Sequence, residues 1–187
     1  DSANHIVLQT YKKVLQGKPD RRWRIEHAQH ISKRDIPRFA ELGVIASMQS
    51  IHCVSDAPFV KKRLGSGRAK IGAYVWKSLL DEGTIICNGT DSPVEDIDPI
   101  KNFYAAVTRN TKSGGFYPDQ KLDRLSALKT FTINGAYSAF EEDIKGSLET
   151  GKLADITVLS GNILTVPDNE ILDIDILYTI VGGNVLY

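Results

Sequence analysis

Two histidines and one aspartate occupy positions from which they could bind a metal ion. His27 ends the strand-like segment 23–27, His52 follows the apolar run 44–48, and Asp91 lies in a turn directly after the run 84–88. Imidazole and carboxylate groups bind zinc and related ions, and a bound ion with an open coordination position can activate water. His27 and His52 are therefore candidate ligands or substrate-orienting groups, and Asp91 is a candidate ligand and general base.

Each of these residues also has a structural interpretation. A histidine at the end of a strand often serves only as a hydrogen-bonding group, and an aspartate before Ser-Pro often opens a turn. His5 and His30, the other two histidines, lie in or beside predicted helices, where we expect them to be solvated. The spacing of His27, His52 and Asp91 alone leaves these alternatives open.

The pattern of elements decides whether these side chains can meet. Helical periodicity at 4–16, a helix at 32–42 with Ser32 as its N-cap, and a helix at 74–80 alternate with strands at 23–27, 44–48 and 84–88. Strict alternation of helix and strand predicts an α/β fold with a parallel sheet covered by helices. Since active residues of such sheets gather at the carboxyl ends of strands, His27, His52 and Asp91 are expected at one edge.

The remainder of the chain changes character near residue 141. Residues 99–140 are predicted to be helical, apart from a glycine-rich interruption at 113–115. Short β-rich runs at 156–159, 176–181 and 185–187 follow, separated by glycine turns. We therefore predict two parts, an α/β part at 1–140 and a β appendage at 141–187.

Composition excludes several classes of partner. The formal net charge is zero, which disfavours nucleic acid or an anionic membrane as the main partner. No apolar stretch reaches the roughly 18 residues of a membrane span, so we expect neither a membrane span nor a signal peptide in this sequence. Cys53 and Cys87 form no CxxC pair, so we expect free thiols and a cytoplasmic protein. The start at Asp1 is expected of a piece cut from a longer protein.

Three motifs, in order, resemble a known family. Residues 24–29 (RIEHAQ), 43–52 (GVIASMQSIH) and 89–94 (GTDSPV) are similar to the last three strands of the metal-dependent amidohydrolase superfamily. The branch is that of N-substituted formamide deformylase-like enzymes and exoenzyme regulatory protein-like chains, and the resemblance continues to residues 146–155. It implies the C-terminal portion of a (β/α)8 TIM-type barrel, strands six to eight, at 1–140, and part of a β-sandwich domain at 141–187.

The resemblance also implies a role for each candidate residue. His27 corresponds to the strand-six histidine that binds metal, and Asp91 to the strand-eight aspartate that binds metal and acts as general base. His52 corresponds to a strand-seven histidine that contacts substrate or stabilises the transition state. The implied cofactor is a divalent metal, zinc before iron, and the implied substrate is a small amide-like molecule.

Other parts of the family pattern are missing from this sequence. There is no His-x-His pair, and the bridging residue of strand four and the strand-five histidine are absent; Asp1 matches the residue after that histidine's glycine. We therefore expect the complete protein to hydrolyse an amide-like C–N bond by metal-activated water, and this chain alone to be inactive. The alternative is a non-catalytic regulatory or binding module derived from such a barrel. Self-association through open sheet edges is a further expectation.

Overall fold

A three-stranded parallel sheet forms the centre of the molecule. The computed structural model describes residues 1–17 and 20–187, so Lys18 and Pro19 of the turn expected before the first strand lie outside the described residues. The strands run in the order β1 (Arg24–Glu26), β2 (Ile45–Met48), β3 (Ile86–Asn88), with Ile25 opposite Ala46 and Ser47 opposite Cys87. All carboxyl ends therefore lie at one edge, as the alternation predicted.

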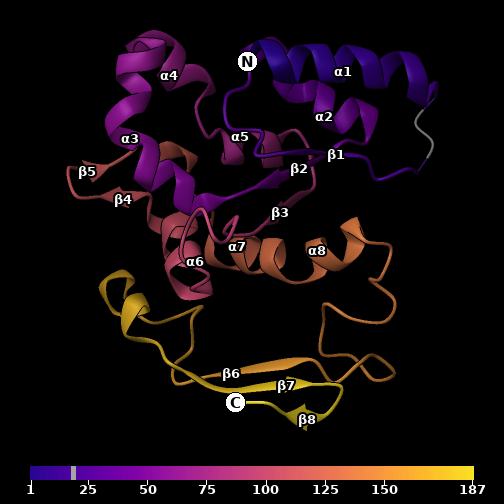
Figure 1. Ribbon diagram of the computed structural model, residues 1–187, viewed down its shortest axis with the longest axis vertical. Coiled ribbons are helices and arrows are strands. Elements are labelled where there is room, and N and C mark those ends of the chain that lie inside the picture. The colour runs from indigo at the N-terminus through magenta and orange to yellow at the C-terminus, as the bar shows by residue number, and fades with distance from the viewer. Residues whose placement is uncertain (18–19) are drawn as a thin grey trace.

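Helices cover both sides of this sheet (Figure 1). Before β3 the chain forms α1 (Ser2–Leu15), η1 (Lys33–Asp35), α2 (Ile36–Leu42), α3 (Ser50–Leu64), α4 (Ser66–Gly72) and α5 (Trp76–Asp81). The sequence predicted only one helix between β2 and β3. Residues 61–70, which are rich in lysine and arginine, form the last turn of α3 and most of α4. The apolar sides of these helices enclose the core around Phe39, Met48, Trp76 and Leu79.

Helix α3 begins earlier than the strand-like pattern suggested. Its first turn contains His52, which is therefore a helical residue and does not terminate a strand. The free N–H groups at the start of α3 are bound by side chains distant in sequence. The Oδ1 atom of Asn88 accepts from the N–H of Ser50 at 3.0 Å, and that of Asn102 accepts from the N–H of Ile51 at 2.8 Å. These bonds satisfy donors that a helix start otherwise exposes, and they fix where α3 begins.

Ser32 plays a different part from the one predicted. Its side chain makes no capping bond to the helix; its hydroxyl donates to Asp35 at 2.5 Å. Asp35 is buried and also contacts His5 at 2.9 Å and Arg38 at 2.6 Å. Asp35 is thus the centre of a buried polar cluster that joins α1 to α2.

The segment after β3 is helical, as expected. It contains α6 (Pro99–Thr108), the short strands β4 (Asn110–Thr111) and β5 (Gly114–Gly115), η2 (Pro118–Gln120), α7 (Arg124–Phe131) and α8 (Ile133–Ser138). The glycine-rich interruption is thus a hairpin, because β4 and β5 pair antiparallel. Asn134 of α8 donates to the carbonyl oxygen of Ile86 at 2.9 Å, which joins α8 to β3.

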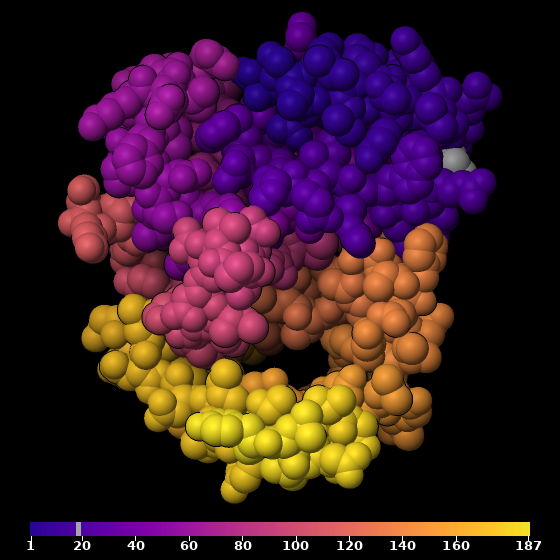
Figure 2. All heavy atoms as spheres, viewed as in Figure 1, coloured from indigo at the N-terminus to yellow at the C-terminus, as the bar shows by residue number. Residues whose placement is uncertain are grey.

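An antiparallel sheet closes the chain at the far end of the molecule (Figures 1 and 2). Its strands are β6 (Ile156–Leu159), β7 (Ile176–Val181) and β8 (Asn184–Val185), in that order, with η3 (Asp168–Asp173) between β6 and β7. The predicted runs at 156–159 and 176–181 therefore become strands, whereas only Val185 of the run at 185–187 lies in β8. Across residues 1–17 and 20–187, no helix combines the length and apolarity needed to cross a membrane.

Candidate metal centre

The structure brings His27, His52 and Asp91 together. Each offers one ligand-capable atom, and these atoms lie within 4.8 Å of one another. His27 follows β1 directly, His52 lies in the first turn of α3, and Asp91 follows β3. The carboxyl edge of the parallel sheet therefore gathers the residues that the sequence singled out.

Unusual backbone angles aim two of these side chains. His27 has φ of 66° and Asp91 has φ of 59°, both in the left-handed region that few residues other than glycine adopt. Such conformations cost of order 1 kcal/mol each and concentrate at functional sites. After Asp91 the chain turns at once, since the N–H of Val94 donates to the Asp91 carbonyl oxygen at 2.8 Å.

A glutamine sets the proton position on His27. The Nδ1 atom of His27 lies 2.9 Å from the Oε1 atom of Gln49, whose side chain is buried. An amide oxygen can only accept, so Nδ1 carries the proton and donates. The Nε2 lone pair of His27 is left free, which is the arrangement that metal-binding histidines usually have.

His52 is buried, and one of its ring nitrogens is unpaired. Its Nε2 atom has no hydrogen-bond partner among the described residues, while its Nδ1 atom lies 3.3 Å from Nε2 of Gln29. The rings of His52 and His27 stack with centroids 5.9 Å apart. Beside the ligand-capable atoms of His27 and Asp91, this unpartnered nitrogen is available to a bound molecule or ion.

Cys53, next to His52, is not a candidate ligand. It is buried and free, and burial raises the pKa of its thiol to about 12. The thiolate form that binds zinc is therefore strongly disfavoured there. Both cysteines are free, as the sequence predicted, and both are buried.

The other two histidines are less solvated than expected. His5 bonds the buried carboxylate of Asp35 at 2.9 Å. His30 packs edge-on against Tyr74, and burial lowers its pKa. The expectation was wrong for both because the α1–α2 packing and the α4–α5 connection cover them, and neither contact is local in sequence.

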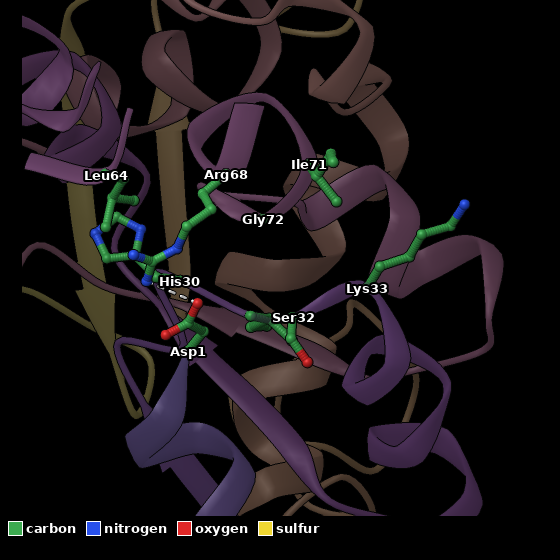
Figure 3. Close-up of a pocket in the computed structure, with 9 residues that line it drawn as sticks. Asp1, His30, Ser32, Lys33, Leu64, Arg68, Ile71 and Gly72 are labelled. Carbon is green, nitrogen blue, oxygen red and sulfur yellow. Dashed lines mark hydrogen bonds and ion pairs between the residues drawn. The ribbon is translucent and has the colours of Figure 1, made fainter. Parts of the chain in front are cut away.

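His30 borders a separate small cavity of about 160 Å³ (Figure 3). The carboxylate of Asp1 and the guanidinium of Arg68 form an ion pair of 2.9 Å at this cavity, beside Ser32. None of its lining residues belongs to the His27, His52 and Asp91 cluster. The cavity is therefore distinct from the candidate metal centre.

Sequence reasoning missed four amide side chains around the centre. They are Gln29, Gln49, Asn88 and Asn102. Gln29 and Gln49 each follow a strand closely, which could have drawn attention to them. Nothing in the sequence marks Asn102, which is fully buried and donates to the carbonyl oxygen of Gly89 at 2.6 Å.

The donor set suits a divalent metal ion. His27 presents a free nitrogen lone pair and Asp91 presents an exposed carboxylate. The two follow β1 and β3, the outer strands of one three-stranded sheet, at the same edge. Nitrogen and carboxylate oxygen ligands match zinc and iron better than calcium or magnesium. The residues present thus fit such an ion.

Comparison with known proteins places the chain in a family. Residues 4–187 match the amidohydrolase family. The chain belongs to this family. This membership confirms the resemblance inferred from the three motifs, and metal-dependent hydrolysis is the chemistry that the family suggests.

Two curated relatives span most of the chain. Protein LONG AFTER FAR-RED 3 of Arabidopsis thaliana is 38% identical over 191 residues, covering 100% of this chain and 33% of the relative. N-substituted formamide deformylase of Arthrobacter pascens is 27% identical over 187 residues, covering 99% of this chain and 34% of the relative. The amidohydrolase chain described here thus spans about a third of the length of these relatives.

Solved structures share the fold. An uncharacterized metal-dependent hydrolase from Pyrococcus horikoshii OT3 superposes with a TM-score of 0.78 at 29% identity, over 90% of this chain and 34% of that one. Atrazine chlorohydrolase TrzN from Arthrobacter aurescens TC1, complexed with zinc, gives a TM-score of 0.59 at 23% identity, over 87% and 35%. The second likeness shows the fold alone. Both support an α/β amidohydrolase fold for this chain.

Proposed function

We propose that residues 1–140 form the last three strands and covering helices of an amidohydrolase (β/α)8 barrel, and residues 141–187 a segment of its β-sandwich domain. The complete protein would hydrolyse an amide-like C–N bond of a small molecule. The observation that carries this proposal is the meeting of His27 and Asp91 at the carboxyl edge of parallel strands, where barrel enzymes place their active sites.

In this proposal His27 and Asp91 bind the metal ion, with zinc as the first candidate and iron as the second. A divalent ion bound there would polarise the scissile carbonyl and lower the pKa of its water. Asp91 accepts the proton of the attacking water and passes it to the leaving nitrogen. The exposure of Asp91 suits this role, because an exposed carboxylate is accessible to water and to a substrate.

This chain alone is proposed to be inactive. A catalytic zinc site usually has three protein ligands, and a three-stranded sheet cannot close a barrel. The remaining ligands and the substrate-contacting loops would come from the rest of a protein of the relatives' length. The free buried thiols Cys53 and Cys87 support a cytoplasmic location.

The test compares the complete protein with its Asp91→Asn variant. We expect bound zinc or iron in the gel-filtered complete protein, hydrolysis of some members of a panel of N-substituted formamides and N-acyl amines, and loss of activity on chelation. Asp91→Asn should lower kcat by about 10³-fold, since it removes the general base. Asp96→Asn is the matched control, because Asp96 is exposed and its carboxylate contacts the surface residue Lys101 at 2.8 Å and the N–H of Asp98 at 3.4 Å. Full activity in Asp91→Asn would refute the assignment.

A second candidate is a non-catalytic regulatory module. It is favoured by one observation, namely that the 38% identical plant relative carries a name that states no reaction. A complete protein that binds metal but hydrolyses no member of the panel would favour this candidate.

A further inference from the structure

We infer that Gln29, Tyr74 and Asp56 are positioning residues that hold His52 as the tautomer protonated on Nε2. In this form His52 donates a hydrogen bond to the oxygen of the bound substrate, and His27 is the metal-binding histidine. The donor role rests on the proposed function, whereas the tautomer follows from the hydrogen bonds themselves.

The donor–acceptor direction of this hydrogen-bond chain is set at Asp56. The hydroxyl of Tyr74 donates to Oδ2 of Asp56. A phenol has a single proton, so the Tyr74 oxygen then offers only lone pairs to its other neighbours. Burial raises the pKa of Tyr74 well above its ordinary range, which keeps that proton in place.

The side chain of Gln29 connects Tyr74 to His52. Its Nε2 atom lies 3.1 Å from the Tyr74 hydroxyl oxygen and 3.3 Å from Nδ1 of His52. Because the Tyr74 oxygen can only accept here, Gln29 must turn its NH₂ group inward. The second hydrogen of that group meets His52 Nδ1, which must therefore be an unprotonated acceptor. The ring proton of His52 is left on Nε2.

Gln49 favours the opposite tautomer of His27. Its side-chain oxygen lies 2.9 Å from Nδ1 of His27, whereas the side-chain nitrogen of Gln29 faces Nδ1 of His52. Two stacked imidazoles thus receive different tautomers from two glutamines. His27 has a free lone pair suited to a metal, and His52 has an N–H suited to an oxygen acceptor.

The unpaired atom of His52 lies where such a donor is useful. Its Nε2 is buried and without a partner among the described residues, and the His27, His52 and Asp91 ligand atoms lie within 4.8 Å of one another. A preorganised donor aimed at an oxygen that gains negative charge stabilises the transition state of acyl transfer. An N–H without a partner in the free protein is already oriented for that task.

The backbone makes this network rigid. The N–H of Tyr74 donates to the carbonyl oxygen of Gln29 at 2.7 Å, so the two residues are joined twice. The Arg109 guanidinium donates to the Tyr74 carbonyl oxygen at 2.8 Å. Tyr74 itself is fully buried and has φ of 55°, a conformation that these bonds maintain.

The experiment measures the tautomers directly. Long-range ¹H–¹⁵N spectra are recorded on the complete protein with [¹⁵N]histidine, before and after addition of Zn²⁺, and His27→Gln and His52→Gln spectra assign the signals. We expect His52 protonated on Nε2 with and without zinc, and His27 protonated on Nδ1 with its Nε2 signal shifted by zinc. A His52 protonated on Nδ1, or one that loses its Nε2 proton on adding zinc, would overturn the inference.

The Gln29→Glu substitution reverses the donor–acceptor direction between residue 29 and His52, with little change in side-chain shape. A carboxylate can only accept, so His52 should become protonated on Nδ1 and lose its donor. We expect kcat to fall about 10²-fold with a smaller change in KM and unchanged metal content. Tyr74→Phe, which keeps the ring, should give mixed tautomers and an intermediate kcat. Gln16→Glu, an exposed position on the surface, is the control.

The outcomes separate the two proposals. An inverted His52 tautomer in Gln29→Glu with unchanged kcat would overturn the donor role while Asp91→Asn still tests the proposed function. Wild-type protein without hydrolytic activity would refute the proposed function and with it the donor role, and the wild-type spectra would still decide the tautomer.

Discussion

The guanidinium of Arg109 lies 4.3 Å above the ring of Trp76, and both side chains are buried. Arg109 also donates to the carbonyl oxygens of Phe116 at 2.7 Å and Tyr74 at 2.8 Å. Burial lowers the pKa of this arginine, which reflects a charge held away from water. The planar guanidinium stacks and donates in two directions at once, so one residue holds the α5 start, the β4–β5 hairpin and the Tyr74 backbone together.

Arg109→Lys should therefore destabilise the protein. A lysine keeps the charge but cannot stack and reach both carbonyl oxygens, so we expect the free energy of unfolding in urea to fall by about 2–4 kcal/mol. Arg34→Lys, at a side chain that is 74% exposed, is the control and should change it by less than about 0.5 kcal/mol. Equal stability of the two variants would contradict a structural role for Arg109.

Gly72→Ala should also destabilise the protein, for a steric reason. A Cβ atom at Gly72 would lie 2.3 Å from the carbonyl oxygen of Ile31, and the N–H of Ile31 donates to the Gly72 carbonyl oxygen at 2.9 Å. The two backbone segments contact each other directly here, so neither can move aside without breaking other contacts. We expect the free energy of unfolding, measured with heat or urea, to fall by about 2–3 kcal/mol.

Gly67 offers a matched control in the same helix. A Cβ at Gly67 would meet nothing within 4 Å, so Gly67→Ala should leave stability unchanged or raise it by up to about 1 kcal/mol. A Gly72→Ala variant as stable as Gly67→Ala would show that the chains around residues 31 and 72 do not pack as described.

Asn102→Asp should weaken metal binding by the complete protein. The Asn102 side chain accepts from the N–H of Ile51, at the start of α3, and donates to the carbonyl oxygen of Gly89. It therefore joins the helix that contains His52 to the turn that contains Asp91. An aspartate can still accept but cannot donate to Gly89. We expect zinc affinity, measured by competition with a chelator, to fall about 10–100-fold. Asn110→Asp, on the exposed hairpin, should leave the affinity unchanged.

The stability of the protein should depend on Asp35 at acid pH. Burial alone would raise the pKa of Asp35, but hydrogen bonds from Ser32, His5 and Arg38 outweigh it and hold that pKa below its ordinary value. An aspartate whose pKa is lower in the folded state stabilises that state above about pH 3.9, and this contribution disappears as pH falls through the folded-state pKa.

Asp35→Asn should remove this dependence. At neutral pH the variant should unfold more easily by about 2 kcal/mol or more, because its buried partners lose an ionised acceptor. The difference from wild type should narrow as urea unfolding is repeated from about pH 5 down to about pH 2. A constant difference over that range would contradict the role of the ionised carboxylate. Asp119→Asn, at an exposed position, serves as control.

The sequence by itself predicted the strands of the parallel sheet and the candidate residues. Apolar runs bounded by Gly43 and Gly83 predicted β2 and β3, and their alternation with helices predicted a parallel sheet. That topology was enough to place His27 and Asp91 at a common edge, because parallel strands share the direction of their carboxyl ends. The three motifs likewise carried the family assignment. The boundary at 140/141 and the catalytic roles remain predictions.

Only the tertiary structure decided how the centre is organised. Helix α3 starts at Ser50 because Asn88 and Asn102, 38 and 51 residues away from their partners, bind its first N–H groups. The proton positions on His27 and His52 depend on which atoms of Gln49 and Gln29 face them. The orientation of the Gln29 amide depends in turn on its hydrogen bond to Tyr74, 45 residues away. Hydrogen bonds between segments distant in the chain leave no periodic trace in the sequence, so local patterns could not reveal them.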